Sequence, residues 1–190
     1  MASSSAASST RAWVLWLGYV ALVYALLPVS RDVLITLDQH ELIGAFITAA
    51  YCGAAILVVY HIVFDVRLTD RVAFAAVVVL GLTFGGLVLG MSIPEERLHF
   101  LQYGLMAILA RRALAPRFGP RRAYVWALVA VGLIGWGDEA IQGFLPDRVY
   151  DPIDVGINLL GALLTLAGYE ALHNELGWRA TTPPAQRPSP

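Results

Sequence analysis

Six apolar stretches, each close to the length of a bilayer-spanning helix, follow one another along the chain, at residues 12–29, 42–64, 72–93, 98–115, 123–145 and 153–169. About 20 apolar residues are needed to cross the hydrocarbon core as a helix. Since 58% of the 190 residues are hydrophobic and only 14% are charged, the chain has too little polar surface for a soluble domain of this size. We therefore expect an all-α fold, a polytopic transmembrane bundle of about six spans.

The last three stretches are less uniform, because polar residues interrupt each of them near one end. A bundle of four spans with re-entrant segments is therefore an alternative. Residues 11–173 are expected to form the transmembrane domain, residues 1–10 a disordered leader, and the Pro-rich residues 178–190 a disordered tail. The lone Cys52 excludes a disulfide framework. No basic patch with interleaved aromatic residues indicates a nucleic-acid partner, so the bilayer is the expected surrounding.

The arginines, which are the only basic residues of the chain apart from four histidines, indicate an orientation. With six spans and a cytoplasmic N-terminus, ten of the 13 arginines fall on the inner side, five of them in the loop "RRALAPRFGPRR". The outer side carries three, Arg31, Arg97 and Arg148. Cytoplasmic loops are enriched in basic residues, so this pattern predicts that both termini are cytoplasmic.

The polar residues of the last three spans meet at one end of this predicted bundle, the outer end. His99 opens the fourth span, the sequence "GWGDEAIQ" with Asp138, Glu139 and Gln142 closes the fifth, and Asp154 and Asn158 open the sixth. Helical spacing arranges several of them in inward-facing stripes. Tyr103 shares a face with His99; Glu139 aligns with Gly132, Gly135 and Gln142, with Asp138 on the flank; and Asp154 aligns with Asn158, Gly161, Thr165 and Gly168.

Structural roles compete with functional ones for several of these residues. Ser92 and Glu95 suit a capping box at the fourth span, and Asp151 before Pro152 suits the N-cap of the sixth. The patterns "GLTFG" and "GLVLG" in the third span favour close helix packing. Asp138 and Glu139 gain nothing from the negative pole at a helix C-terminus.

The two carboxylates at the end of the fifth span therefore need another partner. The alternatives are Arg148, hydrogen bonding with His99 or Asn158, a bound cation, or a positive group of a ligand. Solvated charges at the aqueous interface are the non-functional explanation.

Three motifs give the chain a family resemblance. The stretches "EERLHFLQYGLMAIL" and "GWGDEAIQGFLPDRVYDPIDVGINLLGALL" resemble the VanZ-like membrane proteins over about residues 95–168. The family pattern is a His-Phe-x-x-Tyr helix start, an Asp/Glu-Glu-x-x-Gln helix end followed by Pro and Arg, and an Asp-x-x-x-Asn-x-x-Gly helix. The chain departs from it in the acidic "PEER" before the His motif and in a larger upstream helix pair. The resemblance implies a bacterial plasma-membrane protein, with the founding member linked to teicoplanin resistance, and implies no established reaction.

Two functional hypotheses follow for this cell-envelope protein. In the first, the outward-facing polar site binds a lipid headgroup, a cell-wall precursor or a glycopeptide antibiotic and contributes to resistance. In the second, the protein is a metal-dependent membrane enzyme acting on a phospholipid or polyprenyl phosphate, with Glu139 or Asp138 as base. The divalent cation would be held by His99, Glu139 and Asp154, although no established metal-binding motif is present. The candidate ligand-binding residues are His99, Tyr103, Asp138, Glu139, Gln142, Arg148, Asp154 and Asn158.

Overall fold

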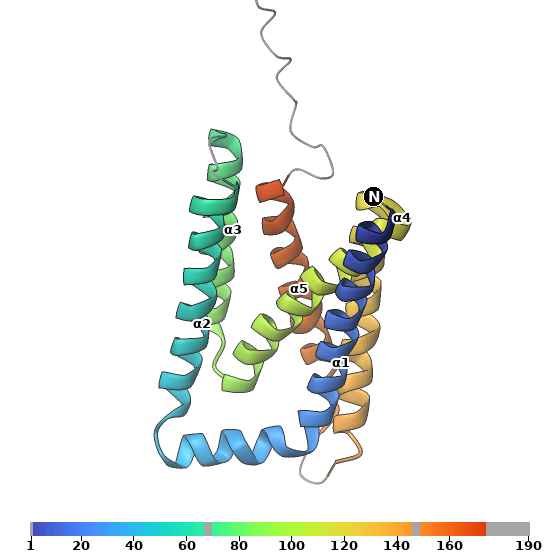
Figure 1. Cartoon of the computed structure of the whole chain (residues 1–190). Coiled ribbons are helices and arrows are strands. Elements are labelled where there is room, and N and C mark those ends of the chain that lie inside the picture. The colour runs from blue at the N-terminus through green and yellow to red at the C-terminus, as the bar shows by residue number, and fades with distance from the viewer. Residues whose placement is uncertain (1, 67–69, 146–148, 174–190) are drawn as a thin grey trace, which may run out of the picture.

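The described part of the chain consists of helices joined by short links, and the all-α expectation is confirmed (Figure 1). The computed structural model describes residues 2–66, 70–145 and 149–173, in which no strand occurs. The helices are α1 (Ala2–Gln39), α2 (Ile43–Tyr60), the π-helix η1 (His61–Val66), α3 (Arg71–Gly90), α4 (Pro94–Gln142) and α5 (Pro152–His173). Within these residues, five helices are long and apolar enough to cross a membrane, with α2 and η1 forming one of them.

Helix α4 contains both the fourth and the fifth of the expected spans. Its 49 residues are interrupted by Gly119, whose φ of 75° and ψ of 165° are not helical, between Pro116 and Pro120. A positive φ of this size suits glycine because a side chain would clash with the backbone. Figure 1 shows the chain rising to this point and then descending, so α4 consists of two arms, before and after Gly119.

Helix α1 is longer than the expected first span at both ends. It begins at Ala2, within the stretch that the sequence predicts to be a disordered leader. Residues 2–10 contain neither glycine nor proline, and three of the nine are alanine, so a helix that is already formed can extend through them. After Pro28, α1 bends and runs across one end of the bundle (Figure 1), as expected because proline removes a helical hydrogen bond.

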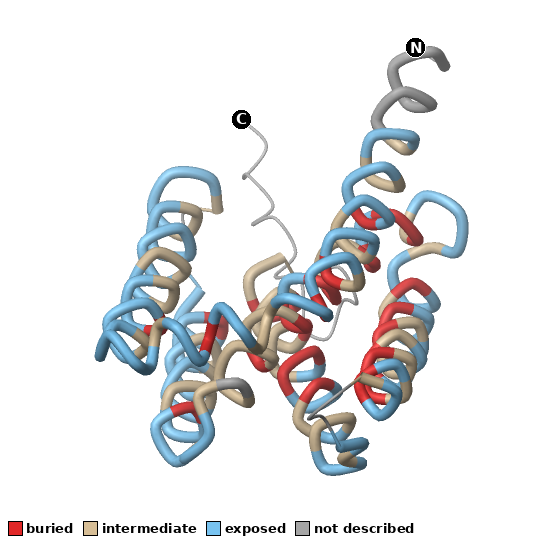
Figure 2. Tube along the Cα trace, turned by 90° about the horizontal axis from the view of Figure 1, so that it is seen from below, coloured by how far each residue is buried: buried red, intermediate tan, exposed pale blue. Residues whose placement is uncertain are grey.

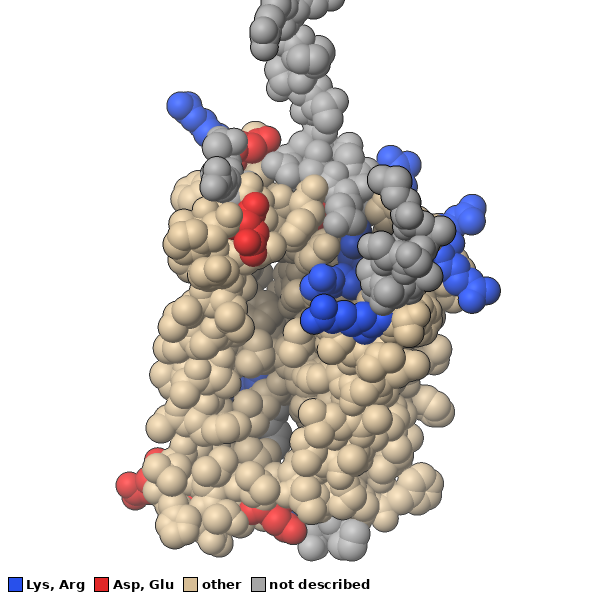
Figure 3. All heavy atoms as spheres, viewed as in Figure 1, with Lys and Arg blue, Asp and Glu red and all other residues tan. Residues whose placement is uncertain are grey.

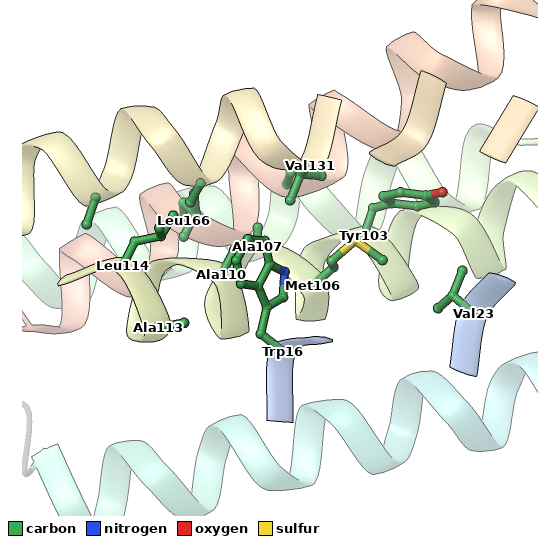
Figure 4. Close-up of a cluster of buried hydrophobic side chains, with 13 residues drawn as sticks. Trp16, Val23, Tyr103, Met106, Ala107, Ala110, Ala113, Leu114, Val131 and Leu166 are labelled. Atoms are coloured by element: carbon green, nitrogen blue, oxygen red, sulfur yellow. The ribbon is translucent and has the colours of Figure 1, made fainter. Parts of the chain in front are cut away.

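The core lies between α1, the two arms of α4 and α5. Figure 4 shows Trp16 and Val23 of α1 facing Tyr103 and Met106 of α4, and all four side chains are buried. The Tyr24 hydroxyl also donates a hydrogen bond of 2.8 Å to the carbonyl of Ile134, which ties α1 to the second arm of α4. The buried positions of Figure 2 concentrate in this part of the molecule, whereas the outer faces are exposed.

The tightest helix crossing joins the first arm of α4 to α5. A Cβ atom on Gly161 would lie 2.7 Å from the carbonyl oxygen of Phe100, so only a glycine fits here. One turn further along the crossing, Gly104 faces Thr165 in the same way. Close backbone approach of this kind is typical of small residues at transmembrane helix interfaces. The crossing holds the start of α4 against the first half of α5, where the polar residues lie.

Helices α2 and α3 stand at the periphery, and two predictions about this region are wrong. No atom lies within 4 Å of a Cβ placed on Gly81, Gly85, Gly86 or Gly90, so the two glycine patterns of α3 pack against nothing in the described chain. Ile93 rather than Ser92 is the N-cap of α4, and the side chain of Ile93 makes no capping hydrogen bond. The Tyr51 hydroxyl of α2 donates a 2.5 Å hydrogen bond to the carbonyl of Arg97, and this bond connects the periphery to the start of α4.

Charged side chains are distributed unevenly along the bundle. Figure 3 shows most of the described arginines near the end at which α1 begins, whereas acidic side chains lie at both ends. The turn at Gly119 carries five of these arginines, between residues 111 and 122. We call this end of the bundle the arginine end. The polar residues of α4 and α5 lie at the other end, where α4 begins and ends and α5 begins.

Candidate metal centre

Three of the predicted residues form one compact group of potential metal ligands. His99 comes from the start of α4, Glu139 from its last turn and Asp154 from the first turn of α5. One ligand atom from each of them lies within 4.8 Å of the other two. Ligand atoms on opposite sides of one ion are about 4 to 5 Å apart. The separation therefore suits a single cation.

Both carboxylate oxygens of Glu139 receive hydrogen bonds within the fold. The Gln142 side-chain amide donates to one of them over 3.2 Å, and the backbone N–H of Asp151 donates to the other over 3.4 Å. Glu139 is almost completely buried, with 1% of its surface exposed. Hydrogen bonds from such outer partners hold a carboxylate in one orientation and are usual around metal ligands.

Asp138 is also buried, which corrects the expectation that it lies on the flank of the helix. It has no exposed surface, and its carboxylate accepts hydrogen bonds from the Tyr103 hydroxyl and, over 3.1 Å, from Gln142. The second arm of α4 packs against both the first arm of α4 and the start of α5. The adjacent residues Asp138 and Glu139 can therefore both be buried. Tyr103 in turn lies edge-on to His99, with ring centroids 6.1 Å apart. The alternative of solvated interfacial carboxylates is therefore wrong for Asp138 and Glu139.

Asn158 brings a polar amide into the same region. It is fully buried, and neither its side-chain nitrogen nor its oxygen has a hydrogen-bond partner among the described residues. A Cβ on Gly135 would lie 3.3 Å from the Asn158 nitrogen and 3.4 Å from the Tyr103 ring. The amide of α5 therefore lies beside both arms of α4. Buried polar atoms are nearly always satisfied in native proteins. The Asn158 amide is therefore a candidate contact for a water or a ligand.

The remaining predicted residues fall into two groups. Asp151 caps α5 by accepting a 2.8 Å hydrogen bond from the backbone N–H of Ile153, which confirms its structural role. Arg148, the expected partner of Glu139, lies outside the described residues. Together, His99, Tyr103, Asp138, Glu139, Gln142, Asp154 and Asn158 converge at one end of the bundle.

The chemistry of this group is that of a hard, oxygen-rich centre with one imidazole. Carboxylate oxygens suit Mg²⁺ and Mn²⁺, and a histidine ligand shifts the preference toward Mn²⁺ or Zn²⁺. His99 and Asp154 are half-buried, whereas Glu139 and Asp138 are buried. An ion would therefore enter from the half-buried side, where His99 and Asp154 lie. Glu139 would bind it from the buried side.

Two buried charged residues were not singled out by the sequence reasoning. Glu170 is 5% exposed and Arg111 is 1% exposed, and both lie toward the arginine end. Glu170 lines an apolar cavity of about 430 Å³ between α3, α4 and α5. Helical spacing could have indicated Glu170, because it lies on the row of residues that begins at Asn158 and continues in steps of four along one face of α5. All four members of that row are buried: Asn158, Ala162, Leu166 and Glu170.

No protein-family model, no curated protein and no solved structure matches this chain. The fold and the site geometry are therefore the basis of the functional assignment.

Proposed function

We propose that this chain is a multi-pass bacterial plasma-membrane protein, a VanZ-like protein, whose polar site binds a divalent cation and through it the anionic headgroup of a lipid or cell-wall precursor. The observation that carries the proposal is the convergence of His99, Glu139 and Asp154 within 4.8 Å. The motif resemblance supports the family, because its three motifs supply the residues of this group.

Six crossings with both termini in the cytoplasm are part of the proposal. The two arms of α4 would each cross once, and the other four long helices once each, because Gly119 reverses the chain. The arginine end would then face the cytoplasm, in keeping with the enrichment of basic residues there. In this orientation the polar site faces outward, at the depth of the lipid headgroups.

A cation explains how a carboxylate-rich site could bind a phosphate-bearing molecule. Asp138, Glu139 and Asp154 would repel a phosphate directly, whereas Mg²⁺ or Mn²⁺ commonly shares its coordination between protein carboxylates and phosphate oxygens. The buried Asn158 amide could then donate to the same phosphate. Binding of the headgroup is thus expected to depend on the cation.

Manganese binding by the purified full-length chain tests the site. The electron paramagnetic resonance signal of free Mn²⁺ falls as the ion binds, and we expect one site in the wild type. Glu139→Gln removes a ligand and should weaken binding at least about tenfold. Glu41→Gln is the matched control, because Glu41 is exposed in the turn after α1 and should leave binding unchanged. A wild type that binds no Mn²⁺, or an unaltered Glu139→Gln variant, would refute the cation site.

Lipid retention tests the second half of the proposal. Native mass spectrometry of protein from phosphatidylglycerol nanodiscs should show bound lipid with Mn²⁺ and a marked loss after chelation. In the Glu139→Gln variant, retention should be low in both conditions. If Arg148 rather than a cation neutralises Glu139, chelation will have no effect and Arg148→Ala alone will reduce retention.

Cysteine accessibility tests the orientation. In a Cys52→Ser background, a cysteine at the exposed Glu41 should react with a membrane-impermeant thiol reagent in intact cells. A cysteine at the exposed Arg117 should react only after the membrane is broken. The opposite pattern would place the polar site on the cytoplasmic side.

A metal-dependent enzyme acting on a phospholipid or polyprenyl phosphate is the second candidate. The observation that favours it is the position of Asp138. This buried carboxylate is next to Glu139 in the chain but is not one of the three potential metal ligands, so it could act as a base toward a substrate whose phosphate the metal polarises. Phosphate release from such a substrate should require both Mn²⁺ and Glu139.

Glycopeptide susceptibility separates the two functions in cells. The binding function predicts that Glu139→Gln alters teicoplanin susceptibility at normal protein abundance, even where no turnover is detected.

A further inference from the structure

Two histidines that lie 112 positions apart in sequence meet at the arginine end of the bundle. The Nε2 atom of His61, in η1, lies 3.2 Å from the Nε2 atom of His173, in the last turn of α5. Their ring centroids are 5.3 Å apart, which exceeds the distance between the two Nε2 atoms by 2.1 Å. The two rings therefore approach each other through the edges that carry Nε2. This contact joins the second apolar helix of the chain to its last one.

The partners of the other ring nitrogens settle the tautomers. His61 Nδ1 lies 2.7 Å from a carboxylate oxygen of Asp65, and His173 Nδ1 lies 2.9 Å from the backbone carbonyl oxygen of Tyr169. An ionised carboxylate and a carbonyl only accept hydrogen bonds, so both Nδ1 atoms must donate. Each neutral imidazole therefore carries its lone pair on Nε2. Two lone pairs 3.2 Å apart repel each other unless a positive species lies between them.

We propose that His61 and His173 hold a divalent transition-metal ion of the zinc class between their Nε2 atoms. Two imidazole nitrogens at about 2.0 to 2.1 Å from a tetrahedral Zn²⁺ are about 3.3 Å apart, close to the observed 3.2 Å. Histidine ligands almost always donate their second N–H to a carboxylate or a carbonyl, as both do here. Water or a further ligand completes the coordination.

Each of the two ligands has a second contact within its own helix. The π-helical turn of η1 places the Asp65 carboxylate 2.7 Å from the Nδ1 atom of His61, and such π-turns occur frequently at functional sites. On the other helix, the Tyr169 ring stacks on His173 with centroids 4.1 Å apart. The guanidinium of Arg111 in turn lies 4.8 Å from the Tyr169 ring centre. His173 thus contacts His61 of η1 and Tyr169 of its own helix, and Tyr169 in turn contacts Arg111 of α4.

This site is separate from the group at His99, since it lies at the opposite end of the bundle (Figure 1). Zinc bound here would tie the end of α5 to the peripheral helix α2. It would thus stabilise the packing of a helix that otherwise has few buried residues.

Zinc titration calorimetry of the chelator-treated full-length protein in detergent tests the proposal. We expect the wild type to show a zinc-binding event at this site. His61→Gln and His173→Gln should each abolish that event, and the double variant should lose nothing more. Glu139→Gln should keep that event, so this result is independent of the cation site proposed above. His40→Gln, at an exposed histidine near the other end, is the matched control and should bind as the wild type.

Asp65→Asn gives a variant that keeps both ligands. Loss of the carboxylate partner should weaken zinc binding by about tenfold or more, as such outer partners usually contribute that much. Wild-type zinc binding that survives in both histidine variants would overturn the proposal. A wild type without this binding event would also overturn it and would leave a shared proton as the species between the rings.

Discussion

Gly161→Ala is the most direct test of the crossing on which the polar site depends. A Cβ at this position would lie 2.7 Å from the carbonyl oxygen and 3.2 Å from the Cα atom of Phe100. Ordinary contact begins at 3.4 Å, so α4 and α5 must separate by about 0.7 Å, the difference between 3.4 and 2.7 Å. Both nearest atoms belong to the backbone, so no side-chain rotation can relieve the clash.

Two opposing terms determine the size of the effect. Overpacking of a tight interface costs about 1 to 3 kcal/mol, whereas replacing a helical glycine by alanine contributes up to about 1 kcal/mol of stability. Gly168→Ala, on the same helix, gains the same helical term, but its Cβ would have no atom within 4 Å. The helical term therefore cancels between the two variants. We expect Gly161→Ala to be about 1 to 3 kcal/mol less stable than Gly168→Ala.

Reversible unfolding in mixed micelles, followed by circular dichroism, measures this difference. The same separation displaces Phe100 and its neighbour His99 away from Asp154, so Mn²⁺ should bind more weakly to Gly161→Ala as well. Equal stability of the two alanine variants together with unchanged Mn²⁺ binding would show that α4 and α5 do not approach as closely as described. Equal stability with weakened Mn²⁺ binding would refute the energetic part of the argument alone.

Three further predictions concern the neighbouring contacts. Tyr103→Phe removes the hydroxyl that donates to the buried Asp138 and should lower the free energy of unfolding by about 1 to 3 kcal/mol, measured as above; an unchanged value would contradict the hydrogen bond. Gly104→Ala should be destabilising because its Cβ meets the Thr165 side chain, and Thr165→Ala should relieve it, with a coupling of at least about 0.5 kcal/mol in a double-mutant cycle. Asp151→Ala should cost about 1 kcal/mol through the lost N-cap of α5 whereas Asp151→Asn should cost little, so equal losses in both variants would argue against capping.

Local periodicity correctly predicted several of the buried positions in α4 and α5. The steps of three and four residues placed Asn158 and Gly161 on an inward face, and both are buried. Glu139 and Gln142 were expected to face inward for the same reason, and both are buried. These predictions succeeded because side chains that share a helical face are set by local geometry alone.

Two of the failures, at Asp138 and at the glycines of α3, have one cause, which is that a helical wheel carries no information about how many neighbours a helix has. Asp138 lies about 100° around the helix from Glu139, and it is buried only because Tyr103 of the first arm of α4 covers that side. The glycines of α3 fit a packing pattern, but no partner lies beside them in the described chain.

The amino-acid sequence by itself determined that this chain folds as long apolar helices with a polar group at one end, because hydrophobic length and helical period are local properties. The tertiary structure decided which of these residues meet. It brought His99, Glu139 and Asp154 within 4.8 Å of one another and placed His61 against His173. Such meetings depend on crossing distances and on the neighbours of each helix, which arise only when segments far apart in sequence pack together.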